Sequence, residues 1–254
     1  GYYQSISRPE FREIAPFSFY DFAEQIFTIG NPDLERNLIR NYDLRFEYFP
    51  YAGEIISVSL FYKKFDSPIE EVFVPNSGGD NRIKTYQNAK SGANNYGIEL
   101  EARKNLGFIT KHMKYFSLNA NISIINSKVD LSGIGSTVTN LERRLQGQSP
   151  YTINMGLYYD NSDLGTSVNL SYNRFGKRIS EVGLEGLSDI EENGRDVVDL
   201  SVMQRLFKNF EVKFTVKDIL AQDYLYTQTI AGKEEMFKKI NAGTGFSLSL
   251  SYKY

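Results

Sequence analysis

The sequence predicts an all-β protein: an antiparallel up-and-down transmembrane β-barrel wall of about ten strands. Three observations support this prediction. Large apolar residues recur at every second position in many short segments, which is the side-chain period of a β-strand. The segments that join these strands differ in length and alternate between long and short. Aromatic residues gather near the ends of the predicted strands, as they do at the borders of a membrane-spanning barrel.

Each predicted strand places apolar residues on one face and polar residues on the other. The last one, Phe246 to Tyr254, alternates Phe, Leu and Tyr with three serines and Lys253. Two segments, 140–146 and 232–239, could each form a turn or two of helix, which is too short to build a helical layer. The other strands are predicted around residues 3–7, 42–48, 56–62, 96–102, 116–124, 151–159, 168–172, 198–202 and 212–216.

The lengths of the connections favour a membrane barrel. Successive connections between antiparallel neighbours lie at opposite ends of a sheet, so strict alternation puts all the long ones at one end. Outer-membrane barrels have this asymmetry, whereas the connections of a Greek-key sandwich cross between two sheets. Loops above about 15 residues are uncommon in compact soluble domains. The long connections are predicted at about 9–38, 66–93, 127–149, 175–195 and 220–243.

Composition excludes several classes of function. The 29 Lys+Arg against 31 Asp+Glu give a net charge of −2, so no basic field points to nucleic acid. The chain has no cysteine and one histidine, His112. It therefore cannot form disulfides, and it has too few cysteines and histidines for the usual zinc sites and catalytic triads. We therefore expect no enzyme activity, no cofactor and no metal site. No run of 18 apolar residues exists, so a transmembrane helix is not predicted.

A second set of residues is predicted to point away from the apolar face. These residues carry both signs of charge, which suits the polar lumen of a barrel; a solvated sheet face in a soluble protein explains them equally well. They are Asp43, Arg45, Glu47, Glu99, Glu101, Arg103, Asp199, Arg205, Glu211, Lys213 and Lys217.

Two motifs lie near the start of the chain. The first is S-R-P-E-F-R-E-I-A-P-F (7–17), and the second is N-P-D-L (31–34) followed by N-Y-D-L-R-F-E-Y (41–48). They resemble the "RPxFxxLxPF" and "NPxLxPExxxNYELGxEY" segments in the carboxy-terminal half of TonB-dependent outer-membrane receptors. The sequence departs at Glu35 and Arg36, where that family usually has Pro-Glu.

The resemblance continues in order along nearly the whole chain. N-N-Y-G-I-E-L-E (94–101) is similar to the family's "GxExE" strand, and L-Q-G-Q-S-P-Y-T-I-N (145–154) to its "LxGQSPYxxN" segment. V-K-D-I-L-A-Q-D-Y (216–224) resembles "VxNLFDxxY", with Asp218 for Asn and Ala221 for Asp. The last strand resembles the terminal strand read by the barrel-assembly machinery, with Tyr254 where Phe is commoner.

The resemblance implies that residues 1–254 are the carboxy-terminal segment of a barrel of about 22 strands, with the plug domain and the TonB box absent from this chain. It implies a location in the outer membrane of a Gram-negative bacterium and active uptake of a scarce nutrient: a siderophore, cobalamin, a glycan or a peptide. The implied partners are the lipid bilayer, TonB through the plug, the barrel-assembly machinery and that ligand. A capping surface lipoprotein is a further partner that the resemblance allows.

Cationic and aromatic loop residues are the candidates for ligand contact, because they suit anionic or ring-bearing ligands. Two alternatives stay open for the whole chain: a self-contained outer-membrane channel of about ten strands, and a soluble β-sandwich binding module. The candidate loop residues are Phe17, Phe19, Tyr20, Phe22, Arg143, Arg144, Lys177 and Arg178.

Overall fold

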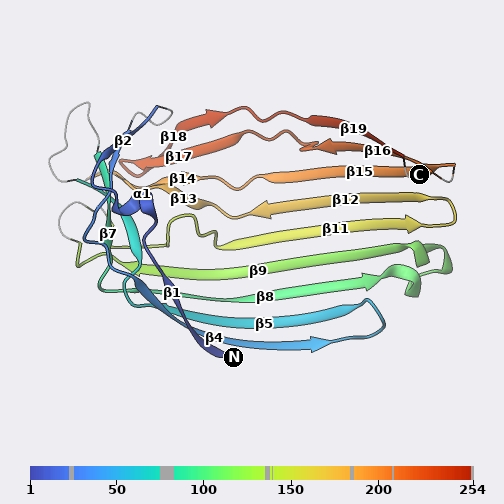
Figure 1. Cartoon of the computed structure of the whole chain (residues 1–254), viewed down its shortest axis with the longest axis horizontal. Helices are drawn as coiled ribbons and strands as arrows, with labels where there is room; N and C mark the ends of the chain where they lie inside the picture. The colour runs from blue at the N-terminus through green and yellow to red at the C-terminus, as the bar shows by residue number, and fades with distance from the viewer. Residues whose placement is uncertain are drawn as a thin grey trace.

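The computed structural model describes residues 1–22, 26–74, 83–134, 138, 140–183, 186–207 and 209–252. Its main element is one curved antiparallel wall in which the long strands follow one another in chain order (Figure 1). The ten strands predicted from sequence are confirmed. They are β1 (Tyr2–Ser7), β4 (Asn37–Tyr48), β5 (Ile55–Phe65), β8 (Ala93–Asn105), β9 (Phe116–Asp130), β11 (Tyr151–Asn161), β12 (Thr166–Phe175), β15 (Asp196–Leu206), β16 (Phe210–Lys217) and β19 (Gly245–Tyr252).

The long and short connections lie at opposite ends of the wall, as predicted (Figure 1). The long connections contain the helix α1 (Phe11–Ile14), the two-residue strand β10 (Glu142–Arg143), which pairs with β9, and two four-stranded sheets. The only helical turns at the other end of the described chain are η1 (Leu106–Phe108) and η2 (Lys111–Tyr115). The first small sheet has β2 (Ser18–Asp21), β3 (Ile26–Ile29), β7 (Ile83–Asn88) and β6 (Ile69–Phe73); the second has β13 (Arg178–Glu181), β14 (Ile190–Glu192), β17 (Tyr224–Ile230) and β18 (Lys233–Ile240).

The apolar face of the wall is exposed along its whole width. Leu44 on β4 is 51% exposed, Leu170 on β12 is 41% exposed and Leu248 on β19 is 66% exposed. No second layer of the described residues covers these side chains, so the two-layer sandwich considered from sequence is wrong. An apolar surface this large requires hydrocarbon or a partner to cover it.

The buried apolar core lies under the long connections and not in the wall. Of the wall residues, only Ala93 and Val129 belong to the buried hydrophobic set, and both lie at the long-connection ends of β8 and β9. They belong to an apolar cluster whose other members come from β6 and from the segments that follow β7 and β9. The other members of this cluster are Val72, Ala89, Leu131 and Ile134.

Rows of directly paired residues cross the wall obliquely. One row begins at Phe46, near the short-connection end of β4, and passes through Val58 on β5 and Leu100 on β8. The same row reaches Arg174 and Asp196 at the long-connection ends of β12 and β15. The strands are therefore staggered, as closure of a barrel requires.

Aromatic residues occupy both ends of the exposed face. Tyr42 lies 5.0 Å from Tyr2 and 6.0 Å from Tyr62, ring centre to ring centre, at the long-connection end. Phe210 and Tyr252 lie 4.9 Å apart at the other end. This placement agrees with the predicted aromatic belts. Tyr254, the last residue of the predicted final strand, lies outside the described residues.

Both predicted helical turns are wrong. Glu142 and Arg143 form the short strand β10 against β9, and Lys233–Ile240 forms β18. The residues of 232–239 favour a helix by intrinsic propensity, but β17 offers a complete set of antiparallel backbone partners. A bulge opposite Tyr226 and Thr227 fits the strand onto this partner.

We expect Leu170→Arg to destabilise the folded protein in lipid vesicles by about 2–4 kcal/mol, because an exposed midplane position would bring a charge into hydrocarbon. Ser171→Arg, one residue along on the opposite face, is the matched control and should cost under about 1 kcal/mol. Urea unfolding in vesicles measures both values. Equal costs for the two variants would contradict the assignment of the faces.

Candidate functional site

The polar face of the wall carries all eleven charged residues predicted to point away from the apolar side. Register places Arg45 beside Ser59 and Glu99, on the face opposite Leu44 and Phe46. Arg45 donates to Glu47 at 2.6 Å and to Glu101 at 2.7 Å. The wall therefore presents paired charges of both signs. Whether this face lines a lumen stays a prediction.

Two shallow grooves run along the polar face below the long connections. The first has a volume of about 460 Å³ and is lined by charged groups that include Asp43, Lys63 and Glu99. The second, of about 370 Å³, is lined mainly by amides and hydroxyls such as Asn121 and Ser171. The polar face thus changes from charged over β4, β5 and β8 to largely neutral over β9, β11 and β12.

Gly97 on β8 explains one of the sequence motifs. A Cβ atom here would lie 2.3 Å from the Ile124 carbonyl oxygen and 2.8 Å from the Phe61 ring. The absence of a side chain at Gly97 leaves room for the ring of Phe61 on β5 to approach the backbone of β8, which is a known use of glycine within a strand. Phe61 lines the charged groove beside Lys63.

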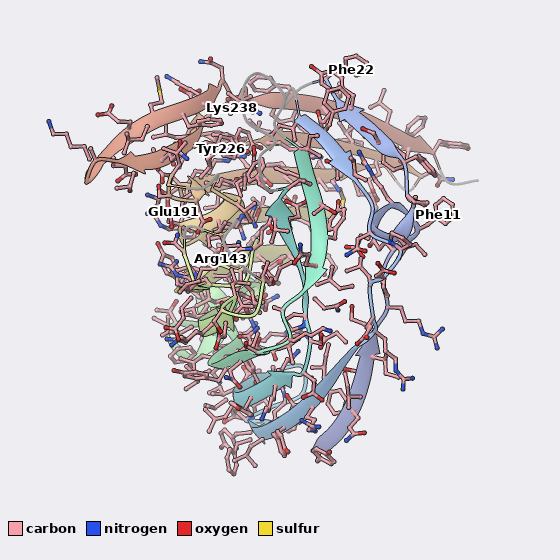
Figure 2. The ribbon with its side chains drawn as sticks, turned by 90° about the vertical axis from the view of Figure 1, so that its left-hand side faces the viewer. Phe11, Phe22, Arg143, Glu191, Tyr226 and Lys238 are labelled. Carbon is pink, nitrogen blue, oxygen red and sulfur yellow. The ribbon has the colours of Figure 1, made fainter. Side chains whose placement is uncertain are left out.

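A buried ion pair joins two of the long connections. Arg143 on β10 donates to Glu70 on β6 at 2.8 Å, and both side chains are at most 5% exposed. Figure 2 shows Arg143 in the interior of the long-connection end. Burial raises the pKa of Glu70 to about 7, since it outweighs the opposing effect of the Arg143 charge; Glu71 and Asp189 raise it further.

A second ion pair extends this network to a third connection. Lys84 on β7 lies 3.2 Å from Glu181 on β13 and 3.9 Å from Glu71 on β6. Gln146 donates to Glu71 at 3.1 Å and to the Ser180 carbonyl oxygen at 3.0 Å. Contacts between charged and amide groups therefore hold the connections after β5, β9 and β12 together.

The other predicted cations are also engaged within the protein. Lys177 lies 2.7 Å from Glu234 and 3.0 Å from Glu191. Arg178 pairs with Glu192 at 2.8 Å. Arg144 is exposed and donates to the Lys177 carbonyl oxygen at 3.1 Å. The structure therefore brings Arg144, Lys177 and Arg178 close together and ties Arg143 to Glu70. Their ligand contact stays a prediction.

The predicted aromatic residues form two groups of rings on the first long connection. Phe17 and Phe19 lie 4.8 Å apart, and Tyr20 lies 4.9 Å from Phe22 and 4.7 Å from Phe27. Phe17 is 52% exposed and Phe22 is 85% exposed. Figure 2 shows Phe22 at the periphery, apart from Arg143. Phe19 and Tyr20 are successive residues of β2, so the two groups lie on opposite faces of the small sheet. We call the two groups together, Phe17, Phe19, Tyr20, Phe22 and Phe27, the aromatic cluster.

The described residues contain no group of three or more His, Cys, Asp and Glu side chains arranged to hold a metal ion. None of the helices in the described part of the chain has both the length and the apolar character needed to span a membrane.

Comparison with known families decides which protein class this wall represents. The family model described as TonB dependent receptor-like, beta-barrel matches residues 1–219. The chain belongs to the TonB-dependent receptor family. No curated protein matches the chain by sequence.

Solved structures of ferric enterobactin and ferric yersiniabactin receptors and of a copper transporter share the fold over nearly the whole chain. The ferric enterobactin receptor PfeA of Pseudomonas aeruginosa, in complex with enterobactin, matches with a TM-score of 0.63 and 15% identity. The ferric yersiniabactin uptake receptor FyuA of Yersinia pestis matches with a TM-score of 0.60 and 13% identity, and the copper transporter OprC with 0.66 and 16%. The chain is covered to 99%, 100% and 99%, but spans 37%, 34% and 36% of those chains.

Most partners in this network were missed by sequence reasoning. Glu70, Glu71, Lys84 and Glu181 were not selected, although they determine what Arg143 and Gln146 contact. The local sequence carried no strand signal, because Glu70 and Glu71 are adjacent and do not alternate with Ile69, Val72 and Phe73. Nothing local indicated that Glu70 is buried.

Arg143→Met should destabilise the long-connection end by about 3–5 kcal/mol at pH 8, because Glu70 would remain as an unpaired buried carboxylate. The loss should shrink at pH 5, where Glu70 is protonated. Hydrogen exchange of the β6 and β10 amides, corrected for intrinsic rates, measures this effect. Arg144→Met is the exposed control, and exchange that rises equally in both variants would contradict a special role for the buried pair.

Glu70 should also give the protein a measurable pH dependence. Its folded pKa of about 7 lies above the ordinary value of 4.5, so its contribution to stability is full below pH 4.5 and is lost as the pH rises through 7. The free energy of unfolding relative to Glu70→Gln should therefore fall by up to about 3 kcal/mol between pH 4.5 and 8. If the difference in unfolding free energy between the two proteins stays constant over this pH range, burial does not raise the pKa of Glu70.

Proposed function

We propose that the chain supplies part of the barrel wall and five ligand-facing connections of an active transporter in the outer membrane of a Gram-negative bacterium. The observation that carries this proposal is the exposed apolar face, which spans all ten strands and has long connections at one rim only. Lipid covers such a face in a membrane barrel. The family supports the same placement.

The ligand is proposed to meet the protein at the long-connection end. The aromatic cluster and the cations Arg144, Lys177 and Arg178 lie there, while the polar face continues below them. Aromatic rings and guanidinium groups suit flat, ring-bearing or anionic ligands. Receptors of similar fold are named for ferric siderophores and copper. We therefore place metal chelates first among the scarce nutrients, ahead of cobalamin, glycans and peptides.

The proposed transport requires partners outside this chain. The polar face of the wall, with its paired charges, would contact a plug through which TonB acts. The last strand, β19, has a regular alternation of apolar residues and serines, which suits recognition by the barrel-assembly machinery. A surface lipoprotein above the long connections is compatible with this arrangement.

A self-contained channel of ten strands is the weaker alternative. It would require β1 to pair with β19, but these are the two end strands of the wall in the described residues. Further strands would complete the barrel, and the greater length of the similar receptors agrees with this.

Uptake measurements test the transporter proposal. Cells that lack the gene should lose uptake of at least one ligand from a panel of labelled ferric chelates, copper and cobalamin, and a protonophore should abolish the uptake in wild-type cells. Uptake that persists without the proton-motive force would indicate a passive channel instead.

The Phe17→Ala/Phe22→Ala variant should bind the ligand identified by these uptake measurements about tenfold more weakly, because it removes two exposed rings from the aromatic cluster. Phe49→Ala, which removes a ring that is 62% exposed between β4 and β5 at the opposite rim, should leave affinity unchanged. Equilibrium binding to the purified protein measures both. An unchanged affinity in the double variant would remove the aromatic cluster from the site.

A further inference from the structure

We propose that one uncharged sector of the polar face, on β9, β11 and β12, is a second ligand-binding surface that accepts uncharged hydroxyl and amide groups of the ligand during its passage. This inference rests on the transporter function proposed above and deepens it. It names the sector of the wall that the ligand follows and the chemistry that this sector accepts.

Formal charge is absent from this sector. It comprises the polar-face residues of three ranges: 117–123 on β9, 152–158 on β11 and 167–173 on β12. None of these residues is acidic or basic. Charged residues border the sector on both sides, with Glu101 on β8 and Asp199 on β15. We call the sector the neutral strip.

A row of amides crosses the neutral strip. Asn121, Asn154 and Asn173 lie directly opposite one another on the three strands, and Asn154 and Asn173 are exposed. Asn173 donates to the side-chain oxygen of Asn154. Within the described residues, the amino group of Asn154, the side-chain oxygen of Asn173 and the whole amide of Asn121 have no further partner. Because amides both donate and accept hydrogen bonds, this row can bind hydroxyl groups or other amides.

A tyrosine connects this row to the short-connection end of the wall. A Cβ atom at Gly156 would lie 2.7 Å from the ring of Tyr158, so the ring covers Gly156. Tyr158 lines both the amide groove of about 370 Å³ and a second groove of about 310 Å³, whose far side includes Glu211 and Lys213 on β16. The Tyr158 hydroxyl has no hydrogen-bond partner in the described part of the chain. The two grooves therefore meet at an unpaired neutral group.

A neutral surface suits passage better than the charged sectors beside it. Passage requires binding that is strong enough for entry and weak enough for release. Hydrogen bonds to ionised groups are about twice as strong as those between neutral groups, so the charged sectors suit lasting contact with a plug. A strongly anionic ligand would lose its hydration along the neutral strip and gain no counter-charge there. The strip therefore favours ligands that present uncharged polar groups.

The first part of the experiment offers three labelled probes to energised cells that carry the full-length protein. The probes are a net-neutral ferric trihydroxamate, a neutral trisaccharide and a strongly anionic ferric tris-catecholate. We expect import of the trihydroxamate or of the trisaccharide, and the one imported shows whether the neutral groups come from a chelate or from a sugar. Import of the tris-catecholate alone would overturn the proposal.

The second part locates the imported probe with two matched thiols. Ser171 lines the amide groove and Ser59 lines the charged groove, and both are partly buried. During import, a saturating probe should slow the reaction of Ser171→Cys with an uncharged thiol reagent about tenfold, since it occupies the strip. The reaction of Ser59→Cys should change less than about twofold. Equal protection of both thiols, or no protection of Ser171→Cys, would overturn the proposal.

The third part removes the amides. Asn154→Leu/Asn173→Leu deletes both partners of one hydrogen bond, so neither is left facing a lost partner. Import should slow about tenfold, while binding at the cell surface stays unchanged because the long connections are intact. A parallel loss of binding, or unchanged import, would count against the strip. Import without protection at Ser171→Cys refutes only the strip, whereas a protein that imports neither these probes nor copper nor cobalamin refutes the transporter itself.

Discussion

The structure depends on the continuous ladder of backbone hydrogen bonds that joins ten strands into a single layer. A single layer cannot bury its own apolar face, so Leu44, Leu170 and Leu248 stay exposed within the molecule. In hydrocarbon every backbone polar group must be satisfied internally, and the ladder does this for all the inner strands. The wall is thus stabilised by strand pairing, and its outward side chains are free to match the membrane.

The long-connection end follows a different physical rule. Here side chains are buried by protein, and the apolar cluster around Val72, Val129 and Leu131 provides a conventional core. Beside it, Arg143 and Glu70 form a buried pair whose carboxyl group has its pKa raised by burial. Such a pair contributes little net stability but is costly to break on one side only. It therefore fixes how the connections after β5 and β9 lie against each other.

The wall could be predicted from sequence because each strand carries its own information. Apolar and polar residues alternate within β4, β9 and β19 regardless of what lies elsewhere in the chain, and the exposure of the two faces follows directly. The small sheets could not be predicted in this way. Arg143 lies 73 residues from Glu70, and Lys84 lies 97 residues from Glu181, so local pattern says nothing about these contacts. The segment of β18 was interpreted as helical because only its partner β17 makes it a strand.

The candidate aromatic residues were recognisable for a related reason. Exposed rings at Phe17 and Phe22 stand out in a connection of otherwise ordinary composition, and no long-range contact is needed to notice them. The cations gave a less reliable signal, since sequence cannot distinguish Arg143, which is buried, from its exposed neighbour Arg144.

The oblique row from Phe46 to Asp196 has a consequence for how variants of this wall should be compared. Residues that face each other across a strand pair differ in depth, and the difference accumulates from β4 to β15. In a membrane-spanning barrel, a single line of cross-strand neighbours would therefore run from near the short-connection rim, through the apolar band, to the long-connection rim. Tolerance to substitution should follow height along the barrel axis, so an alignment of strands by pairing alone would mix positions that experience different solvents.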